Sequence, residues 1–70
     1  MDVILLFASN SGTMVATKAL RDSGVQARMI PTPRSAQSAS NLCLRVDGAA
    51  EAAALAALEL AKVSVSAIVR

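Results

Sequence analysis

The sequence predicts an α+β fold with the element order βαββαβ. Two observations indicate it: apolar or alternating runs typical of strands flank two segments rich in helix-forming residues, and polar turn residues separate these elements. This order is typical of the ferredoxin-like split βαβ arrangement. Because crossover connections are right-handed, we expect a four-stranded antiparallel sheet with the first and third strands in its centre and two helices on one face. Residues 1–70 then form a single domain.

The first strand and helix occupy residues 3–22. Residues 3–8, "VILLFA", form a continuous apolar run, which is typical of a strand buried on both faces. The following stretch, "SNSGT", offers good helix N-cap residues. A glycine-containing loop before a helix can also bind the phosphate of a flavin, as in flavodoxins. A flavodoxin-like sheet needs more parallel strands than this chain can supply, and the chain has no Trp or Tyr to hold a flavin ring. We therefore interpret residues 9–13 as a capped helix start, with the helix over residues 13–22 and its stop at Gly24.

The second and third strands are predicted at residues 25–30 and 42–46, where side-chain character alternates. The segment between them, "PTPRSAQSASN", is long for a connection in so small a domain, and long loops are often functional. Its two prolines stiffen the backbone and remove amide donors. The loop could therefore direct an arginine and several hydroxyl groups at an anion or a partner chain, or it could simply be a solvated connection. The candidate residues are Pro31, Pro33, Arg34, Ser35, Ser38, Ser40, Asn41 and, on the next strand, Arg45.

Cys43 is the only soft nucleophile of the chain, and a single cysteine excludes an internal disulfide. Only a thiolate is reactive, and nearby cations favour it. Arg45 shares the strand face of Cys43, and Arg28 on the neighbouring strand is expected to face the same side. Cys43 could thus hold a persulfide or selenide anion. The alternative is that Cys43 is a small buried hydrophobe.

The second helix is predicted over residues 49–62 and a last strand over residues 63–69. The helix has its charged residues and Leu55 on one side, and mainly alanine with Leu60 on the other. Either the alanine side packs on the sheet, or Leu55 and Leu58 pack inward and an apolar surface faces outward. An outward apolar surface needs a partner, so we expect a homo-oligomer. The alternative is that alanine is merely a tolerated helix former. The interface candidates are Ala53, Ala56 and Leu60.

Composition excludes several function classes. The seven basic residues are scattered and the net charge is only +2, which is not the footprint of a nucleic-acid-binding protein. The apolar run at the start is far shorter than the roughly 20 residues of a membrane span, and without a basic n-region or a cleavage site we do not expect it to be a signal peptide. Histidine, the commonest general base and metal ligand, is absent. We expect a cytoplasmic protein that is not an enzyme, with no cofactor, metal, membrane or nucleic-acid partner.

The chain resembles a family of small bacterial and archaeal domains, the putative Se/S carrier-like proteins. The resemblance covers nearly all of the chain and is strongest at "MIPTPRS", residues 29–35. It also includes the strand ending in "FAS", the "LCLRV" of residues 42–46 and the final "VSAIVR". It implies a non-enzymatic sulfur or selenium carrier or delivery factor, with Cys43 as the carrier candidate and an enzyme of sulfur or selenium metabolism as a partner.

The sequence departs from the family pattern at two places. The family typically has a Cys-Gly pair just before the third strand, where this chain has Ser40 and Asn41. The family often has Thr-His-Asp at the helix start, where this chain has residues 10–12, "NSG". Two interpretations therefore stay open. One is a carrier with a displaced cysteine, and the other is a self-associating or docking module with no chemistry of its own.

Overall fold

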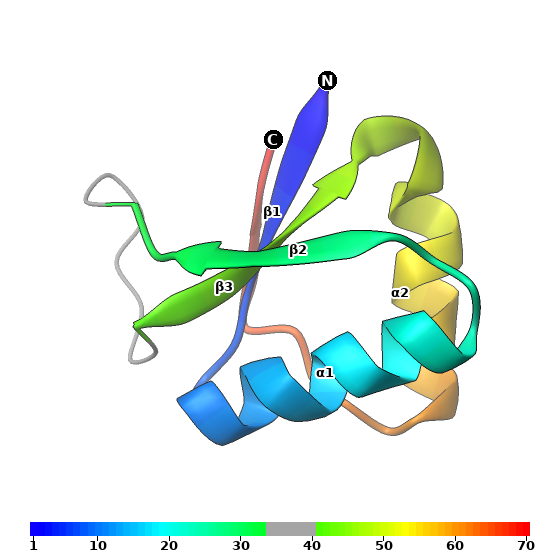
Figure 1. Cartoon of the computed structure of the whole chain (residues 1–70), viewed down its shortest axis with the longest axis horizontal. Helices are drawn as coiled ribbons and strands as arrows, with labels where there is room; N and C mark the ends of the chain where they lie inside the picture. Colours follow the sequence, from blue (N-terminus) through cyan, green and yellow to red (C-terminus); the bar gives the residue numbers. More distant parts are fainter. Residues whose placement is uncertain (34–40) are drawn as a thin grey trace.

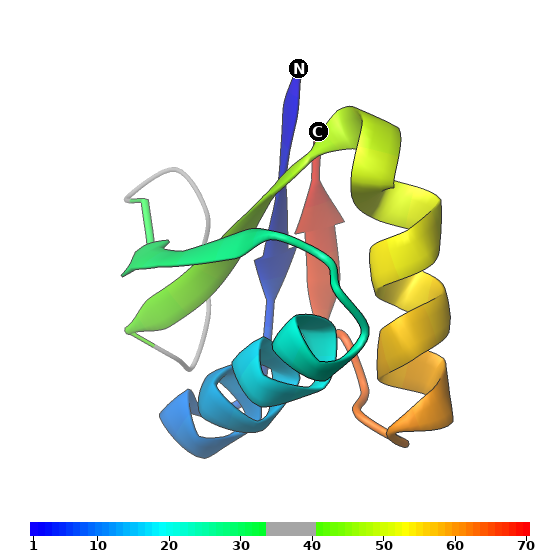
Figure 2. The ribbon, with the colours of Figure 1, turned by 45° about the vertical axis from the view of Figure 1, so that its right-hand side comes forward.

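The computed structural model describes residues 1–33 and 41–70. Its four strands form one antiparallel sheet in the order β2-β3-β1-β4 (Figure 1). Both helices lie on the same side of this sheet (Figure 2). The predicted ferredoxin-like fold is therefore confirmed, with the first and third strands in the centre.

The elements agree with the predicted order, and their bounds differ by one or two residues in the first three strands and by more at some ends of the helices and in the last strand. They are β1 (Asp2–Leu6), α1 (Asn10–Asp22), β2 (Ala27–Pro31), β3 (Leu42–Asp47), a 3₁₀ turn (Gly48–Ala50), α2 (Glu51–Leu60) and β4 (Ala67–Val69).

The prediction of a strand over residues 63–69 was too long. After α2, Lys62 adopts a positive φ of 59°, and the amide of Val63 donates to the Leu58 carbonyl at 2.9 Å. Val63 and Val65 then pack against the core without joining the sheet. Valine and serine alternate over residues 63–66 as they would in a strand, but this segment precedes β4 and is not part of it.

The start of α1 is a capped helix, as predicted, although it begins at Asn10. Ser9 is in the extended conformation and its Oγ accepts the Gly12 amide at 3.0 Å. This bond satisfies one of the amides that every helix start leaves unpaired. At the other end Gly24 has a φ of 76°, which is the left-handed conformation expected for a glycine after a helix.

The register sorts the side chains of the sheet onto two faces. Val3 pairs with Val46, and Leu5 pairs with Leu44, so these four side chains share the face toward the helices. They form the centre of a small apolar core in which a buried leucine contributes about 1.5–3 kcal/mol. The core consists of Val3, Leu5, Phe7, Ala16, Leu20, Leu44, Val46, Ala54, Ala57 and Leu58.

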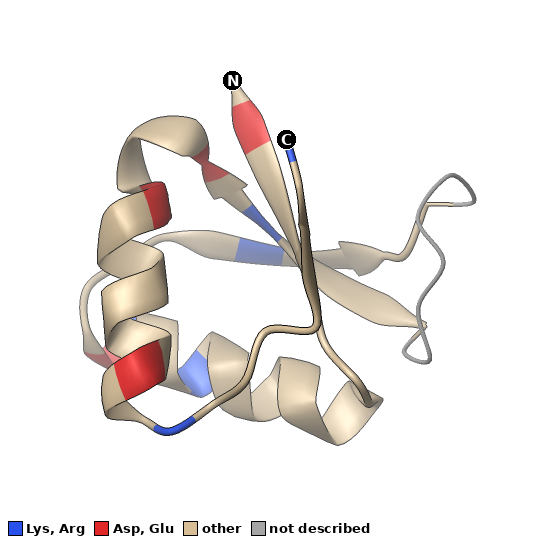
Figure 3. Cartoon of the chain, turned by 180° about the vertical axis from the view of Figure 1, so that it is seen from behind, with Lys and Arg blue, Asp and Glu red and all other residues tan. Residues whose placement is uncertain are grey.

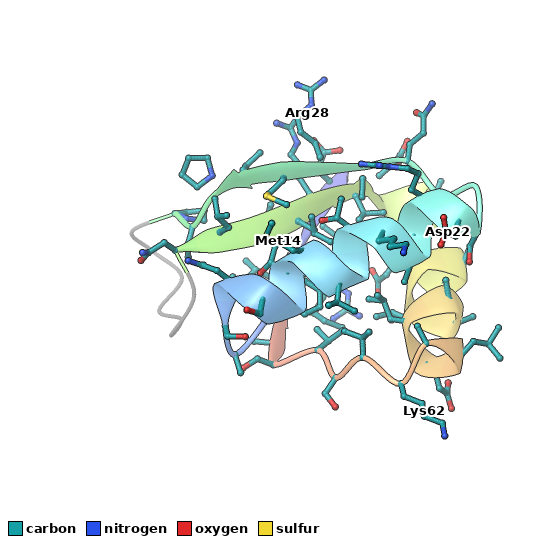
Figure 4. The ribbon with its side chains drawn as sticks, turned by 60° about the horizontal axis from the view of Figure 1, so that its bottom comes forward. Met14, Asp22, Arg28 and Lys62 are labelled. Carbon is teal, nitrogen blue, oxygen red and sulfur yellow. The ribbon has the colours of Figure 1, made fainter. Side chains whose placement is uncertain are left out.

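The opposite face of the sheet, called here the open face, carries the side chains at the alternate positions. Ile4 and Arg28 both pair with Arg45, which places the three in one row across β1, β3 and β2. Figure 4 shows the Arg28 side chain pointing away from both helices. Cys43 lies two positions from Arg45 and therefore shares this face, as predicted.

Helix α2 packs with Leu55 and Leu58 inward, as in the second of the two predicted arrangements. Leu58 is buried and Leu55 is half-buried against the core, with Ala54 and Ala57 beside them. The outward side consists mainly of alanines and Leu60, with one acidic residue, Glu59, beside them, and Leu60 is 85% exposed. The interface candidates Ala53, Ala56 and Leu60 are thus all on the surface.

Candidate functional site

Cys43 lies inside β3, directly opposite Ile30 of β2, and it is fully buried. Its thiol is 3.7 Å from the Ile30 carbonyl oxygen and 3.8 Å from that of Pro31, to which it donates weak hydrogen bonds. Burial raises the pKa of the Cys43 thiol above its ordinary value, and a hydrogen bond with the Thr32 side chain lowers this pKa to a smaller extent. The thiol is therefore neutral at physiological pH, whereas the thiolate is the nucleophile.

The two arginines that share the open face with Cys43 are not among the causes that shift the pKa of its thiol. Arg45 forms an ion pair with Asp2, with its Nη2 2.5 Å from Asp2 Oδ2. Arg28 lies directly opposite Arg45 and forms no ion pair within residues 1–33 and 41–70. The pKa of Cys43 follows from burial and from Thr32. The prediction that Cys43, Arg45 and Arg28 share one face of the sheet is confirmed. The contacts of the sulfur with the β2 carbonyls depend on strand pairing.

The two ends of the β2–β3 connection are tied together and to the first turn of α1. The Thr32 amide donates to the Asn41 carbonyl at 2.9 Å, and the Asn41 amide donates to Asn10 Oδ1 at 2.9 Å. Thr13, which is fully buried, donates from its hydroxyl to the Leu42 carbonyl at 3.1 Å. These bonds fix the base of the loop against the helix.

The base of the loop also joins two segments that are far apart in the chain. Residue 10 begins α1 and residue 41 precedes β3, and a hydrogen bond joins them. Sequence reasoning assigned Asn10 and Thr13 only to the helix start. Both lie in the polar stretch of residues 9–13, where a cap and a tertiary contact have the same local pattern.

The predicted loop residues are only partly placed. Pro31 ends β2 and is exposed, Pro33 is half-buried, and Asn41 is exposed just before β3. Arg45 lies on the open face, as described above. The remaining candidates, Arg34, Ser35, Ser38 and Ser40, lie outside the described residues.

A groove of about 660 Å³ lies at the β2 edge of the sheet, and sequence reasoning missed it. It follows residues 24–28, between the last turns of α1 and the open face. No single stretch of sequence signals it, because it depends on which strand forms the edge. Its lining residues are Asp2, Thr17, Arg21, Gly24, Val25, Gln26, Ala27, Arg28, Arg45 and Asp47.

The charges in this groove are not balanced. Of its two carboxylates, Asp2 is paired with Arg45, and Asp47 accepts the Ala49 amide at 3.0 Å as the cap of the 3₁₀ turn. Figure 3 shows the basic positions of β2 and β3 side by side in the sheet, and the register pairs Arg28 with Arg45. Arg28 and Arg21 therefore line the groove without a carboxylate of their own among the described residues.

In the described part of the chain, no three Cys, Asp and Glu residues are grouped so that they could hold a metal ion. None of its helices has both the length and the apolar character that crossing a bilayer requires.

Comparison with known proteins gives one match. The model of the family described as "Putative Se/S carrier protein-like" matches residues 2–70. Searches of the curated proteins and of the solved structures gave no match.

Proposed function

The chain belongs to the putative Se/S carrier-like family, and on this premise we propose that it is a non-enzymatic accessory protein that docks on an enzyme of sulfur or selenium metabolism. In this proposal the chain contributes a binding surface and no thiol chemistry. The observation that carries it is the burial of Cys43, the only cysteine of the sequence.

The physical argument concerns access and protonation. A carrier thiol must meet its donor as a thiolate, whereas Cys43 is fully buried and its pKa is raised by burial. Its sulfur also contacts two carbonyl oxygens of the adjacent strand and its side chain is not exposed, so that a donor could reach it only after a local opening of the structure. Such openings cost free energy, and for core strands the cost approaches the global stability.

A native mass spectrum before and after exposure to a persulfide donor tests this proposal. We expect no adduct on the wild-type protein, because the thiol is closed. The variant Asn41→Cys is the matched control, since residue 41 is exposed and two positions away from Cys43. It should gain one adduct. A stable adduct on the wild-type protein that disappears in Cys43→Ser would overturn the proposal.

The second candidate function is that adduct-forming carrier itself, with Cys43 as the chalcogen-bearing atom. The family name favours it, and Cys43 is the only thiol that could serve. The same spectrum distinguishes the two functions, because only the carrier predicts a covalent adduct on the unmodified chain.

We also propose that the protein self-associates through the outer side of α2. Leu60 is 85% exposed there, with Ala53 and Ala56 on the same side of the helix. An antiparallel pair of α2 helices would place each Leu60 against the small alanines of the other copy. Such a contact removes from water the most exposed leucine of the described chain.

A further inference from the structure

Strand β2 is an edge of the sheet formed by the described residues. Within residues 1–33 and 41–70 it pairs only with β3, so alternate N–H and C=O groups over residues 27–30 point away from the sheet. Such an edge is a template on which an extended segment of another chain can add a strand. The groove of about 660 Å³ meets the first two residues of this edge, Ala27 and Arg28, and continues along residues 24–26 before the strand.

The charge of the groove indicates what kind of segment fits. Arg28 extends from the open face and Arg21 comes from the last turn of α1, so the two arginines approach the edge from opposite faces. Arg45, directly opposite Arg28, already has Asp2 as its carboxylate, whereas Arg28 has no carboxylate among the described residues. A carboxylate placed on the outer side of Arg28 would complete a charge pair there.

We propose that the β2 edge binds an extended acidic segment of a partner protein, which adds to the sheet as a fifth strand. Side chains alternate between faces along such a strand. One acidic residue therefore pairs with Arg28 on the open face, and an adjacent acidic residue meets Arg21 on the helix side. This inference rests on the proposed docking function and identifies where and to what the protein docks.

A second copy of this chain fits the edge less well than an acidic segment does. Two β2 strands paired antiparallel around a twofold axis would place both Arg28 side chains on the same open face. That arrangement would add a third cation to the row that already contains Arg28 and Arg45.

The test is a titration of the ¹⁵N-labelled full chain with a short capped peptide that has two adjacent glutamates among threonine and valine. We expect saturable shifts and slowed amide exchange at residues 27–30. Arg28→Glu should weaken binding at least about fivefold, because it replaces an attractive charge pair with a repulsive one. Lys18→Glu is the matched control, since it makes the same charge change at an exposed position outside the groove, and it should bind as the wild type does.

Three outcomes would overturn this inference: no saturable response along β2, equal binding by Arg28→Glu, or equal binding of a peptide with glutamines in place of the glutamates. The thiol of the same samples is probed separately. A closed Cys43 without peptide binding would overturn the site on β2 and leave the docking function standing. A reactive Cys43 would overturn the docking function itself.

Discussion

Strand pairing brings the Cys43 sulfur into contact with the backbone carbonyls of β2. Its neighbours are the backbone of β2 and the Thr32 side chain, and its side chain is fully buried. The effect of burial on the thiol pKa exceeds that of the Thr32 hydrogen bond, so that the neutral form is favoured. A thiol that is both buried and neutral contributes to packing.

Deprotonation of Cys43 should destabilise the fold. Because the pKa of the folded state is raised, the native protein binds this proton more tightly than the unfolded chain does. The stabilising contribution is therefore fully present below the pKa of the unfolded thiol and is lost as pH rises through the folded pKa. Urea midpoints should fall more steeply above the ordinary thiol pKa in the wild type than in Cys43→Ala. Parallel curves for the two proteins would contradict the raised pKa.

The junction between β3 and α2 depends on Gly48. Its amide donates to the Met1 carbonyl at 2.6 Å, which connects the start of β1 to the 3₁₀ turn. A Cβ on residue 48 would lie 2.5 Å from that same oxygen. A glycine is therefore required here by close backbone approach, since its φ is not positive.

Gly48→Ala should cost about 1–3 kcal/mol of stability, because the backbone must move to relieve the overlap. Gly12→Ala is the matched control: its added Cβ would meet nothing closer than 3.5 Å. In the first turn of α1 this second change should leave stability unchanged or raise it by up to about 1 kcal/mol. Chemical denaturation of both variants measures the difference. A Gly48→Ala protein as stable as the wild type would show that β1 does not approach the turn this closely.

Local sequence was sufficient for the order of the elements, for the capped start of α1 within three residues and for its end at Asp22. The apolar run of β1, the Ser9 cap and the turn at Gly24 each depend on near neighbours in the chain. The last strand was predicted too long, because an alternating segment such as residues 63–66 has the same pattern whether it pairs or only packs.

The candidate site was predictable only in part, because a local pattern shows which residues share a face of a strand but not which strands pair. Alternation along β3 placed Cys43 and Arg45 on one face, whereas the burial of the sulfur depends on the register with β2. The bond between Asn10 and Asn41 joins residues 31 positions apart, and the groove needs β2 to be the edge strand. Neither is visible in a local pattern.

At the scale of the whole molecule, α2 presents an apolar surface that a small domain would gain from covering. The core contains one aromatic side chain and several alanines, which limits the apolar area that folding alone can bury. Association through Leu60 would extend that burial. The ion pair of Arg70 with Glu51, at 2.5 Å, links the end of the chain to the start of α2 and leaves the Leu60 end uncovered by it.

Leu60→Glu should shift the protein toward monomer, because it places a charge on the proposed contact. Sedimentation velocity across a concentration series measures the change. Val15→Glu is the matched control, since it makes the same apolar-to-acidic change at an exposed position of α1. It should associate as the wild type does. An unchanged association state of Leu60→Glu would contradict the α2 interface.

The central claim is that the only thiol of the chain is closed to donors, and its reaction rate under native conditions tests this most directly. The rate would be followed with a coloured disulfide reagent, before and after unfolding in urea. We expect Cys43 to react at least about 100-fold more slowly in the native protein, as a site that reacts only through rare opening must. The exposed thiol of Asn41→Cys should react quickly in both states. A native Cys43 that reacts as fast as the unfolded chain would contradict the account and favour the carrier function.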